Sequence, residues 1–156
     1  MVMPDQSILT EASAIMLLLA RSHPEAALIP VQPTDEARMF EWMNWLATVH
    51  AATVATILRP ERFVDDEGLH PALKKKGLNT LRENYSLIDE RVKGKKFSAG
   101  DRYSLSDAYM IVFYRWGHRI GLAMNEYPSW CEMMEEIAKR PAIQRALGQE
   151  GITLSS

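Results

Sequence analysis

Two polar residues, Ser104 and Asp107, have types and a spacing that could support chemistry. A hydroxyl and a carboxylate three residues apart could serve as a general acid or base. The same Ser-x-x-Asp spacing is that of a capping box, in which each side chain accepts a hydrogen bond from the backbone of the other at a helix start. Because a helical pattern begins at Ser104, we interpret this pair as structural.

The single cysteine and three of the four histidines suggest no further reactive centre. The single cysteine, Cys131, lies beside Trp130 with no basic residue placed to activate it, so we expect an inert thiol. One cysteine also excludes an internal disulfide and a multi-cysteine zinc site. His23, His70 and His118 do not follow the spacings of metal ligands, and the sequence therefore predicts no metal.

The overall composition is that of an ordinary globular protein and predicts one domain. Of 156 residues, 47% are hydrophobic and 24% are charged, and 18 basic against 20 acidic residues leave a net charge of −2. This balance argues against a basic surface for nucleic acid or membrane, and the longest apolar run, Ala12–Ala20, is too short to span a bilayer. With its lone cysteine, the chain is predicted to be cytoplasmic, with no nucleic-acid and no membrane partner.

Helical periodicity dominates the elements that must position these residues. One short extended piece is expected at Ser7–Thr10, and Thr34 is expected to cap the second helix, with Asp35 and Glu36 in its first turn. The sequence predicts an all-α bundle of five to six helices with short connectors. The expected helices are Glu11–Arg21, Thr34–Leu58, Pro71–Val92, Ser104–Ile120, Ser129–Lys139 and Pro141–Leu147.

The first of these helices differs from the others in being apolar almost all round. A helix of this kind, here Ala12–Ala20, needs cover on more than one face. The remaining helices supply one layer and can cover only one of these faces. We therefore expect a homo-oligomer whose interface includes Ala12–Ala20, because burying three large apolar side chains is worth about 5–8 kcal/mol.

Three segments, in matching order and spacing, resemble the glutathione S-transferase family. The resemblance covers roughly residues 7–152, and Asp107–Trp116 and Gln149–Gly151 are most similar to the bacterial beta class. The three segments are Leu9-Thr10-Glu11-Ala12-Ser13-Ala14-Ile15, Gly100-Asp101-Arg102-Tyr103-Ser104-Leu105-Ser106-Asp107-Ala108 and Lys139-Arg140-Pro141-Ala142-Ile143-Gln144-Arg145-Ala146-Leu147.

The resemblance implies that the chain has two parts and that it lacks the family's main catalytic residue. Residues 1–25 would be the remnant of a thioredoxin-like N-terminal domain, its last strand and helix, and residues 33–152 the C-terminal helical domain. The family's catalytic Cys, Ser or Tyr and its cis-proline loop would precede this remnant, and Pro4 does not match that proline. The main catalytic residue is therefore assigned to no position, and the chain alone is expected to have negligible activity.

Glutathione contacts are implied for the start of the first helix. Glu11 matches the family's acidic residue, whose carboxylate can pair with the α-amino group of glutathione, while the first-turn amides bind its α-carboxylate. Ala12 replaces the usual hydroxyl residue, and Ser13 could compensate from the next position. The alternative is that Glu11 is simply an acidic residue favoured by the helix dipole.

His50 is the candidate catalytic residue, and Tyr114, Arg115 and Trp116 are the candidate wall of the substrate pocket. Beta-class enzymes carry a histidine on this helix that reaches the glutathione thiol, but His50 arrives one residue before the matching position, Ala51. One residue turns a helix by about 100°, so a histidine in the cleft and a histidine elsewhere both remain open. Trp116 could equally be core, with Arg115 on the surface.

Two functions of different classes follow from this resemblance. The first is conjugation of glutathione, as co-substrate, to a hydrophobic electrophile, to which this chain would contribute only part of the site. The second is a non-catalytic interaction module, because similar free-standing helical domains occur in translation factors and aminoacyl-tRNA synthetase complexes. The module requires only a surface, and no partner motif is evident in the sequence.

Overall fold

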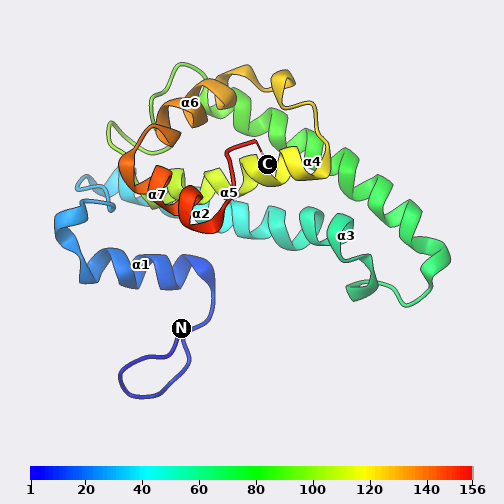
Figure 1. The fold of residues 1–156 in the computed structure, drawn as a ribbon, viewed down its shortest axis with the longest axis horizontal. Coiled ribbons are helices and arrows are strands. Elements are labelled where there is room, and N and C mark those ends of the chain that lie inside the picture. The colour runs from blue at the N-terminus through cyan, green and yellow to red at the C-terminus, as the bar shows by residue number, and fades with distance from the viewer. Residues whose placement is uncertain (156) are drawn as a thin grey trace.

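The computed structural model describes residues 1–155, and its regular structure is helical throughout (Figure 1). The π-helical turn His50–Val54 joins α2 to α3, so these two helices form one continuous rod. The predicted all-α fold is confirmed. In chain order the α-helices are α1 (Ala12–Ser22), α2 (Pro33–Val49), α3 (Ala55–Leu58), α4 (His70–Val92), α5 (Leu105–Ile120), α6 (Pro128–Ala138) and α7 (Pro141–Glu150).

Before α1 the chain forms a small loop rather than a strand that belongs to a sheet. The segment expected to be extended, Ser7–Thr10, contributes a single antiparallel bridge between Val2 and Ile8. The Met3 N–H donates to the Ser7 carbonyl at 2.9 Å and closes the loop. Within residues 1–155 this bridge is the whole of the β-structure, because no neighbouring strand is present to extend it.

The helix ends follow local rules, with one correction. The prediction that Thr34 caps the second helix is wrong: α2 begins at Pro33 and Gln32 occupies the N-cap. Proline suits the first helical position because its φ is already helical and its missing N–H would have no partner there. Asp35 and Glu36 lie in the first turn, as expected.

The Ser104–Asp107 pair forms the predicted capping box at the start of α5. The Ser104 N–H donates to Asp107 Oδ2 at 2.8 Å, and the Ser98 N–H donates to Asp107 Oδ1 at 2.7 Å. Ser104 and Asp107 are both 0% exposed. The carboxylate therefore ties the loop before α5 to the helix, and solvent is excluded from it.

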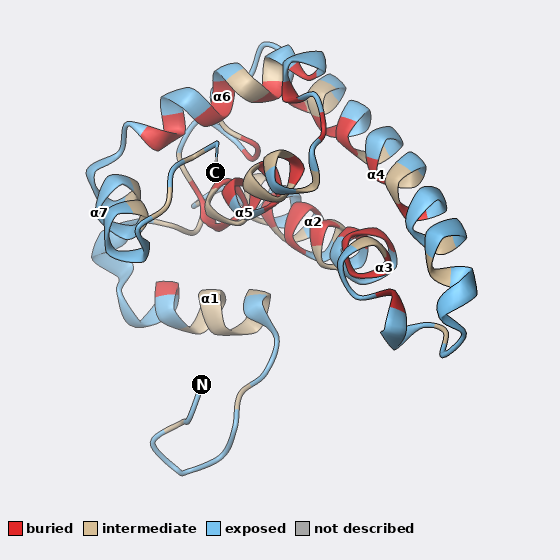
Figure 2. Cartoon of the chain, turned by 45° about the vertical axis from the view of Figure 1, so that its right-hand side comes forward, coloured by how far each residue is buried: buried red, intermediate tan, exposed pale blue. Residues whose placement is uncertain are grey.

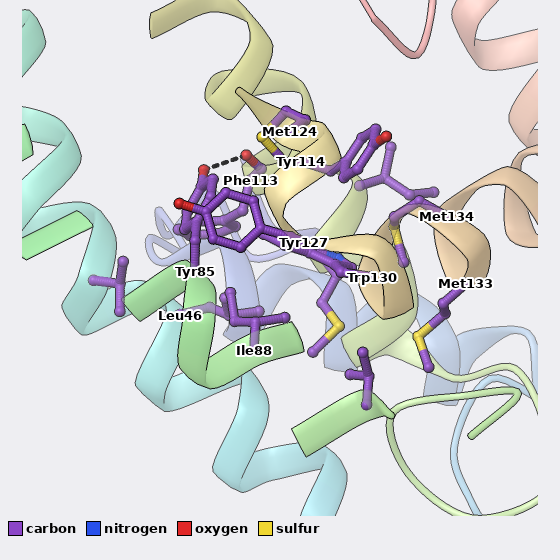
Figure 3. Close-up of a cluster of buried hydrophobic side chains, with 14 of the residues drawn as sticks. Leu46, Tyr85, Ile88, Phe113, Tyr114, Met124, Tyr127, Trp130, Met133 and Met134 are labelled. Carbon is purple, nitrogen blue, oxygen red and sulfur yellow. Dashed lines mark hydrogen bonds between the residues drawn. The ribbon is translucent and has the colours of Figure 1, made fainter. Parts of the chain in front are cut away.

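The main core lies between α2, α4, α5 and α6 and is built on large aromatic side chains (Figure 3). The sequence predicts that Trp42, Trp45 and Trp130 pack in the interior. Trp42 and Trp130 are at most 1% exposed, and Trp45 is partly buried against the same core, so the prediction is confirmed. The Tyr85 hydroxyl on α4 donates to the Phe113 carbonyl on α5, and the Tyr85 ring meets Trp130 edge to face at 4.8 Å. These contacts fix α5 against α4 and α6.

Helix α1 lies apart from the main core and covers one side of the α2–α5 pair (Figures 1 and 2). Its buried residue Ala20, with the partly buried Met16, packs in a second cluster with Met39 and Met43 of α2. Leu19 is 48% exposed. The predicted need for cover on a second side is therefore unmet within the described chain.

Within residues 1–155, no helix has the combination of length and apolar character that a membrane span requires. The described chain also holds no group of three His, Cys, Asp or Glu residues placed to bind a metal ion.

Candidate functional site

The candidate site lies where the end of α2 meets the C-terminal half of α5. The imidazole of His50 stacks on the indole of Trp116, with ring centroids 5.0 Å apart and planes inclined by 28°. The ring centroids of Trp116 and Phe113 are 5.1 Å apart, and those of Phe113 and Tyr109 are 5.3 Å apart. These three α5 residues share one helix face because they are spaced by four and three positions. The result is an aromatic row that runs along α5 to His50.

The surroundings of His50 favour its neutral form. Partial burial of the ring lowers its pKa below the ordinary 6.5, and the positive charges of Arg62 and Arg59 lower it further. A neutral imidazole can accept a proton at one nitrogen and donate a hydrogen bond from the other. His50 can therefore act as a base or as a hydrogen-bond partner of a thiol.

A π-helical turn begins at His50 and was not foreseen from the sequence. The Ala55 N–H donates to the His50 carbonyl, five residues back, and the Thr53 hydroxyl donates to the Val49 carbonyl at 2.5 Å. Turns of this kind are uncommon and often occur at functional sites. The ring that meets Trp116 belongs to His50, the first residue of this turn.

The start of α1 approaches the other end of the aromatic row. Burial raises the pKa of Tyr109 above the ordinary 10, and the negative charge of Glu11 raises it further. Glu11 occupies the N-cap with a positive φ of 66°, which costs a non-glycine residue about 1–3 kcal/mol and is typical of functional positions. The first helical bond runs from the Ile15 N–H to the Glu11 carbonyl, so the Ala12 and Ser13 amides have no helical acceptor.

Tyr114 and Arg115 do not join this face. Tyr114 is 5% exposed, and its hydroxyl donates to the Cys131 Sγ at 3.4 Å inside the core. Arg115 turns toward the C-terminal segment, where its Nε donates to the Thr153 carbonyl at 2.8 Å. Successive residues on a helix point about 100° apart, so three consecutive side chains cannot form one wall. The structure thus brings together His50 and Trp116 but not their two neighbours.

Four residues that the sequence analysis did not single out belong to this region: Tyr109, Phe113, Arg59 and Arg62. The two α5 aromatics could have been found, because Tyr109, Phe113 and Trp116 follow the spacing of a single helix face. Arg59 directly follows α3 and Arg62 ends the turn Pro60–Arg62, and their positive charges lower the pKa of His50. No pattern in the sequence predicts that turn.

The larger surface hollows lie elsewhere. One of about 460 Å³ lies at the C-terminal end of α1 beside Ala20 and Leu28. Another of about 370 Å³ lies between the Lys95 loop and α6. Neither is lined by His50 or Trp116, so the candidate site is a stacked surface rather than one of these hollows.

Comparison with known proteins finds glutathione S-transferases among the relatives of this chain. The glutathione S-transferase GstA of Escherichia coli O157:H7 is 28% identical over 97% of this chain, and the match covers 73% of that protein. The glutathione S-transferase GST-4.5 of Xanthomonas campestris pv. campestris is 26% identical over 95% of this chain, again over 73% of its own length.

Solved structures of bacterial glutathione transferases have the same fold. A glutathione transferase homologue from Sulfitobacter, determined with bound glutathione, superposes with a TM-score of 0.87 at 25% identity, over 97% of this chain and 73% of that one. The beta-class glutathione S-transferase of Sphingomonas chungbukensis has a TM-score of 0.80 at 25% identity, over 98% and 73%.

The family model described as glutathione S-transferase, C-terminal domain, matches residues 46–141, which include His50, the π-helical turn, the capping box and Trp116. This chain therefore belongs to the glutathione S-transferase C-terminal domain family.

Proposed function

We propose that this chain supplies the helical side of a site that conjugates glutathione to a hydrophobic electrophile. The observation that carries the proposal is the stack of His50 on Trp116, at one end of an aromatic row whose other end lies near Glu11. Phe113 is fully buried, so the accessible part of the row is the partly exposed Tyr109 and Trp116. The Trp116 ring suits a hydrophobic electrophile, and the neutral imidazole stacked on it suits a thiol.

Each group has a role in this proposal. The Glu11 carboxylate pairs with the α-amino group of glutathione, and the amides of Ala12 and Ser13 hold its α-carboxylate. His50 accepts a hydrogen bond from the glutathione thiol or donates one to the thiolate, which favours ionisation of the sulfur. Trp116 supports the electrophile that the thiolate attacks.

We further propose that residues 1–25 are the end of a thioredoxin-like domain and residues 33–152 the helical domain. No position of this chain is assigned the family's main thiol-activating role, and matched relatives extend beyond the region it covers, since the match spans 73% of GstA. We place the protein in the cytoplasm, which suits a lone Cys131.

The chain alone is predicted to catalyse negligible conjugation. Purified protein mixed with glutathione and 1-chloro-2,4-dinitrobenzene should give the non-enzymatic rate, because a hydrogen bond from His50 alone does not orient the thiol. Absorbance of the conjugate measures the rate. A rate well above the blank that disappears in His50→Ala would show that this chain activates the thiol by itself.

Ligand binding tests the proposal independently of turnover. Glutathione should bind with a dissociation constant weaker than about 1 mM, and S-hexylglutathione more tightly, because its hexyl group reaches the aromatic surface. The Trp116 indole N–H should shift in NMR spectra with the S-hexyl ligand. Indole shifts confined to Trp42 or Trp130, or no shift at any tryptophan, would favour the interaction module instead.

We also propose a homodimer through Ala12–Ala20. Leu19 on α1 is 48% exposed, and residues 15–18 are only partly buried, so this face gains most from a second copy. Sedimentation should show a dimer at micromolar concentration, and Leu19→Glu should convert it to a monomer. The matched control is Leu87→Glu on α4, where a leucine 40% exposed lies outside the proposed interface. A monomeric wild-type protein would contradict the proposal.

A further inference from the structure

A surface hollow between the end of α6 and the loop that joins α4 to α5 collects basic side chains. Its volume is about 300 Å³, and neither His50 nor Trp116 lines it. Sites for small ligands have volumes of roughly 300–1,000 Å³, so a small organic molecule fits this hollow. The described residues that line it are Lys96, Phe97, Glu136, Ile137, Lys139 and Arg140.

The lining of this hollow is positively charged. Three of its side chains are basic and one is acidic, so at neutral pH the lining carries a net charge of +2, in a chain whose net charge is −2. The single carboxylate, that of Glu136, forms an ion pair with the Lys139 ammonium group. Within residues 1–155 the ion pairs include neither Lys96 nor Arg140. The charges of these two residues are therefore not neutralised by a carboxylate of the described chain.

Two aromatic rings in contact with each other hold these two cations. The Arg140 guanidinium carbon lies 3.9 Å from the centroid of the Tyr103 ring, and the Lys96 ammonium nitrogen lies 5.5 Å from the centroid of the Phe97 ring. The Tyr103 and Phe97 rings meet edge to face, with centroids 6.4 Å apart. A guanidinium group that stacks on a ring keeps its N–H fork in a fixed direction, so less side-chain entropy is lost when a ligand binds.

Charge distinguishes this hollow from the larger one beside it. The hollow of about 370 Å³ shares Lys96 and Glu136 with it, and Lys95 and Glu132 complete the charged lining of that larger hollow. Two basic and two acidic side chains leave the larger hollow without net charge at neutral pH. An anion is therefore favoured in the smaller hollow, where Phe97 also offers an apolar surface to an organic group.

We propose that the smaller hollow binds a phosphomonoester, whose phosphate group lies between Arg140 and Lys96 and whose organic group lies against Phe97. A phosphate monoester carries a charge of about −1.5 to −2 at neutral pH, which complements the net charge of the lining. The guanidinium fork donates to two phosphate oxygens at once, and the ammonium group binds as a point charge. This site is separate from glutathione conjugation and stands even if that proposed function fails.

Three ligands with the same ring and different charges test this site. Phenyl phosphate is a dianion near pH 7.5, benzenesulfonate a monoanion, and phenol neutral. Isothermal titration calorimetry should show the tightest binding for phenyl phosphate, binding about tenfold weaker for benzenesulfonate, and no measurable binding for phenol, because one charged contact is worth roughly one decade in affinity. Equal affinities for the two anions, or no binding of phenyl phosphate, would contradict the proposal.

Variants of the two cations locate the binding site. Arg140→Gln should weaken phenyl phosphate about tenfold and Lys96→Gln severalfold, with circular dichroism showing that each variant folds. Lys96 is exposed, so its variant keeps the test intact if Arg140→Gln does not fold. Arg145→Gln, which removes an exposed arginine of α7 outside the hollow, is the charge-matched control and should leave the affinity unchanged. His50→Ala should also leave it unchanged, because His50 does not line this hollow.

The pattern of losses separates this inference from the proposed function. If neither cation variant weakens phenyl phosphate, or if Arg145→Gln weakens it as much as they do, the ligand is not held in this hollow and the inference is wrong. If only His50→Ala weakens it, the phenyl ring binds on the His50–Trp116 stack, which contradicts the inference and supports the aromatic site of the proposed function.

Discussion

Replacing Asp107 by alanine should lower the melting temperature by about 6–20 °C. The carboxylate accepts the N–H groups of Ser98 and Ser104 at 2.7 and 2.8 Å and the Ser104 hydroxyl at 3.0 Å, and all of these groups are buried. Two buried N–H groups without a partner cost roughly 3–5 kcal/mol together, and each kcal/mol shifts the melting temperature by about 2–4 °C in a domain of this size.

Graded variants identify the origin of the loss. Asp107→Asn retains one carbonyl oxygen and should lose less than Asp107→Ala, and Ser104→Ala should cost only about 1 kcal/mol. Asp101→Ala, on the exposed loop just before α5, is the control and should leave the melting curve unchanged. An Asp107→Ala protein that melts with the wild type would show that the capping box does not hold this loop.

The pH dependence provides a second readout. Burial raises the pKa of Asp107 above the ordinary 3.8, and this outweighs the opposing hydrogen bonds from Ser98 and Ser104. Between 3.8 and the raised pKa, the folded protein holds a proton that the unfolded chain has released, so stability rises as the pH falls through this window. Asp107→Asn lacks this gain, and its deficit relative to the wild type should therefore widen on acidification.

The helices and their core were predictable because burial imposes a period of 3.6 residues on the sequence. Trp42 and Trp130 were assigned to the interior, and the Ser104–Asp107 box was placed correctly, since both predictions depend only on local spacing. The Thr34 cap failed for an equally local reason. Pro33 begins the helix one residue earlier, because proline is well suited to the first helical position.

The site was predicted less completely because it depends on the direction in which single side chains point. The sequence leaves open whether His50 faces the cleft, since one residue on a helix changes the direction by about 100°, and the structure stacks the His50 ring on Trp116. The positive φ of Glu11 likewise has no signature in the sequence. The sequence alone argues against grouping Tyr114 with Trp116, because residues two positions apart on a helix point about 200° apart.

The close approach of α4 and α5 makes Gly117 the most sensitive position next to the candidate site. A Cβ atom at Gly117 would lie 2.4 Å from the Met124 Sδ and 2.7 Å from the Tyr85 Cε2. Met124 is flexible, but Tyr85 cannot move easily, since its hydroxyl is bound to the Phe113 carbonyl and its ring packs at 4.8 Å against Trp130. Any side chain at this position therefore separates α5 from α4.

Gly117→Val should accordingly destabilise the fold by about 3 kcal/mol and lower the melting temperature by about 6–12 °C. Gly117→Ala should cost less, because one methyl group can be relieved in part by movement of Met124. The matched control is Gly148→Ala on α7, where a Cβ would meet nothing within 4 Å. There the loss of backbone freedom in the unfolded chain should stabilise the protein by up to about 1 kcal/mol. The two alanine variants are thus expected to shift the melting temperature in opposite directions, and a Gly117→Ala protein as stable as Gly148→Ala would show that α4 and α5 are not in contact at this glycine.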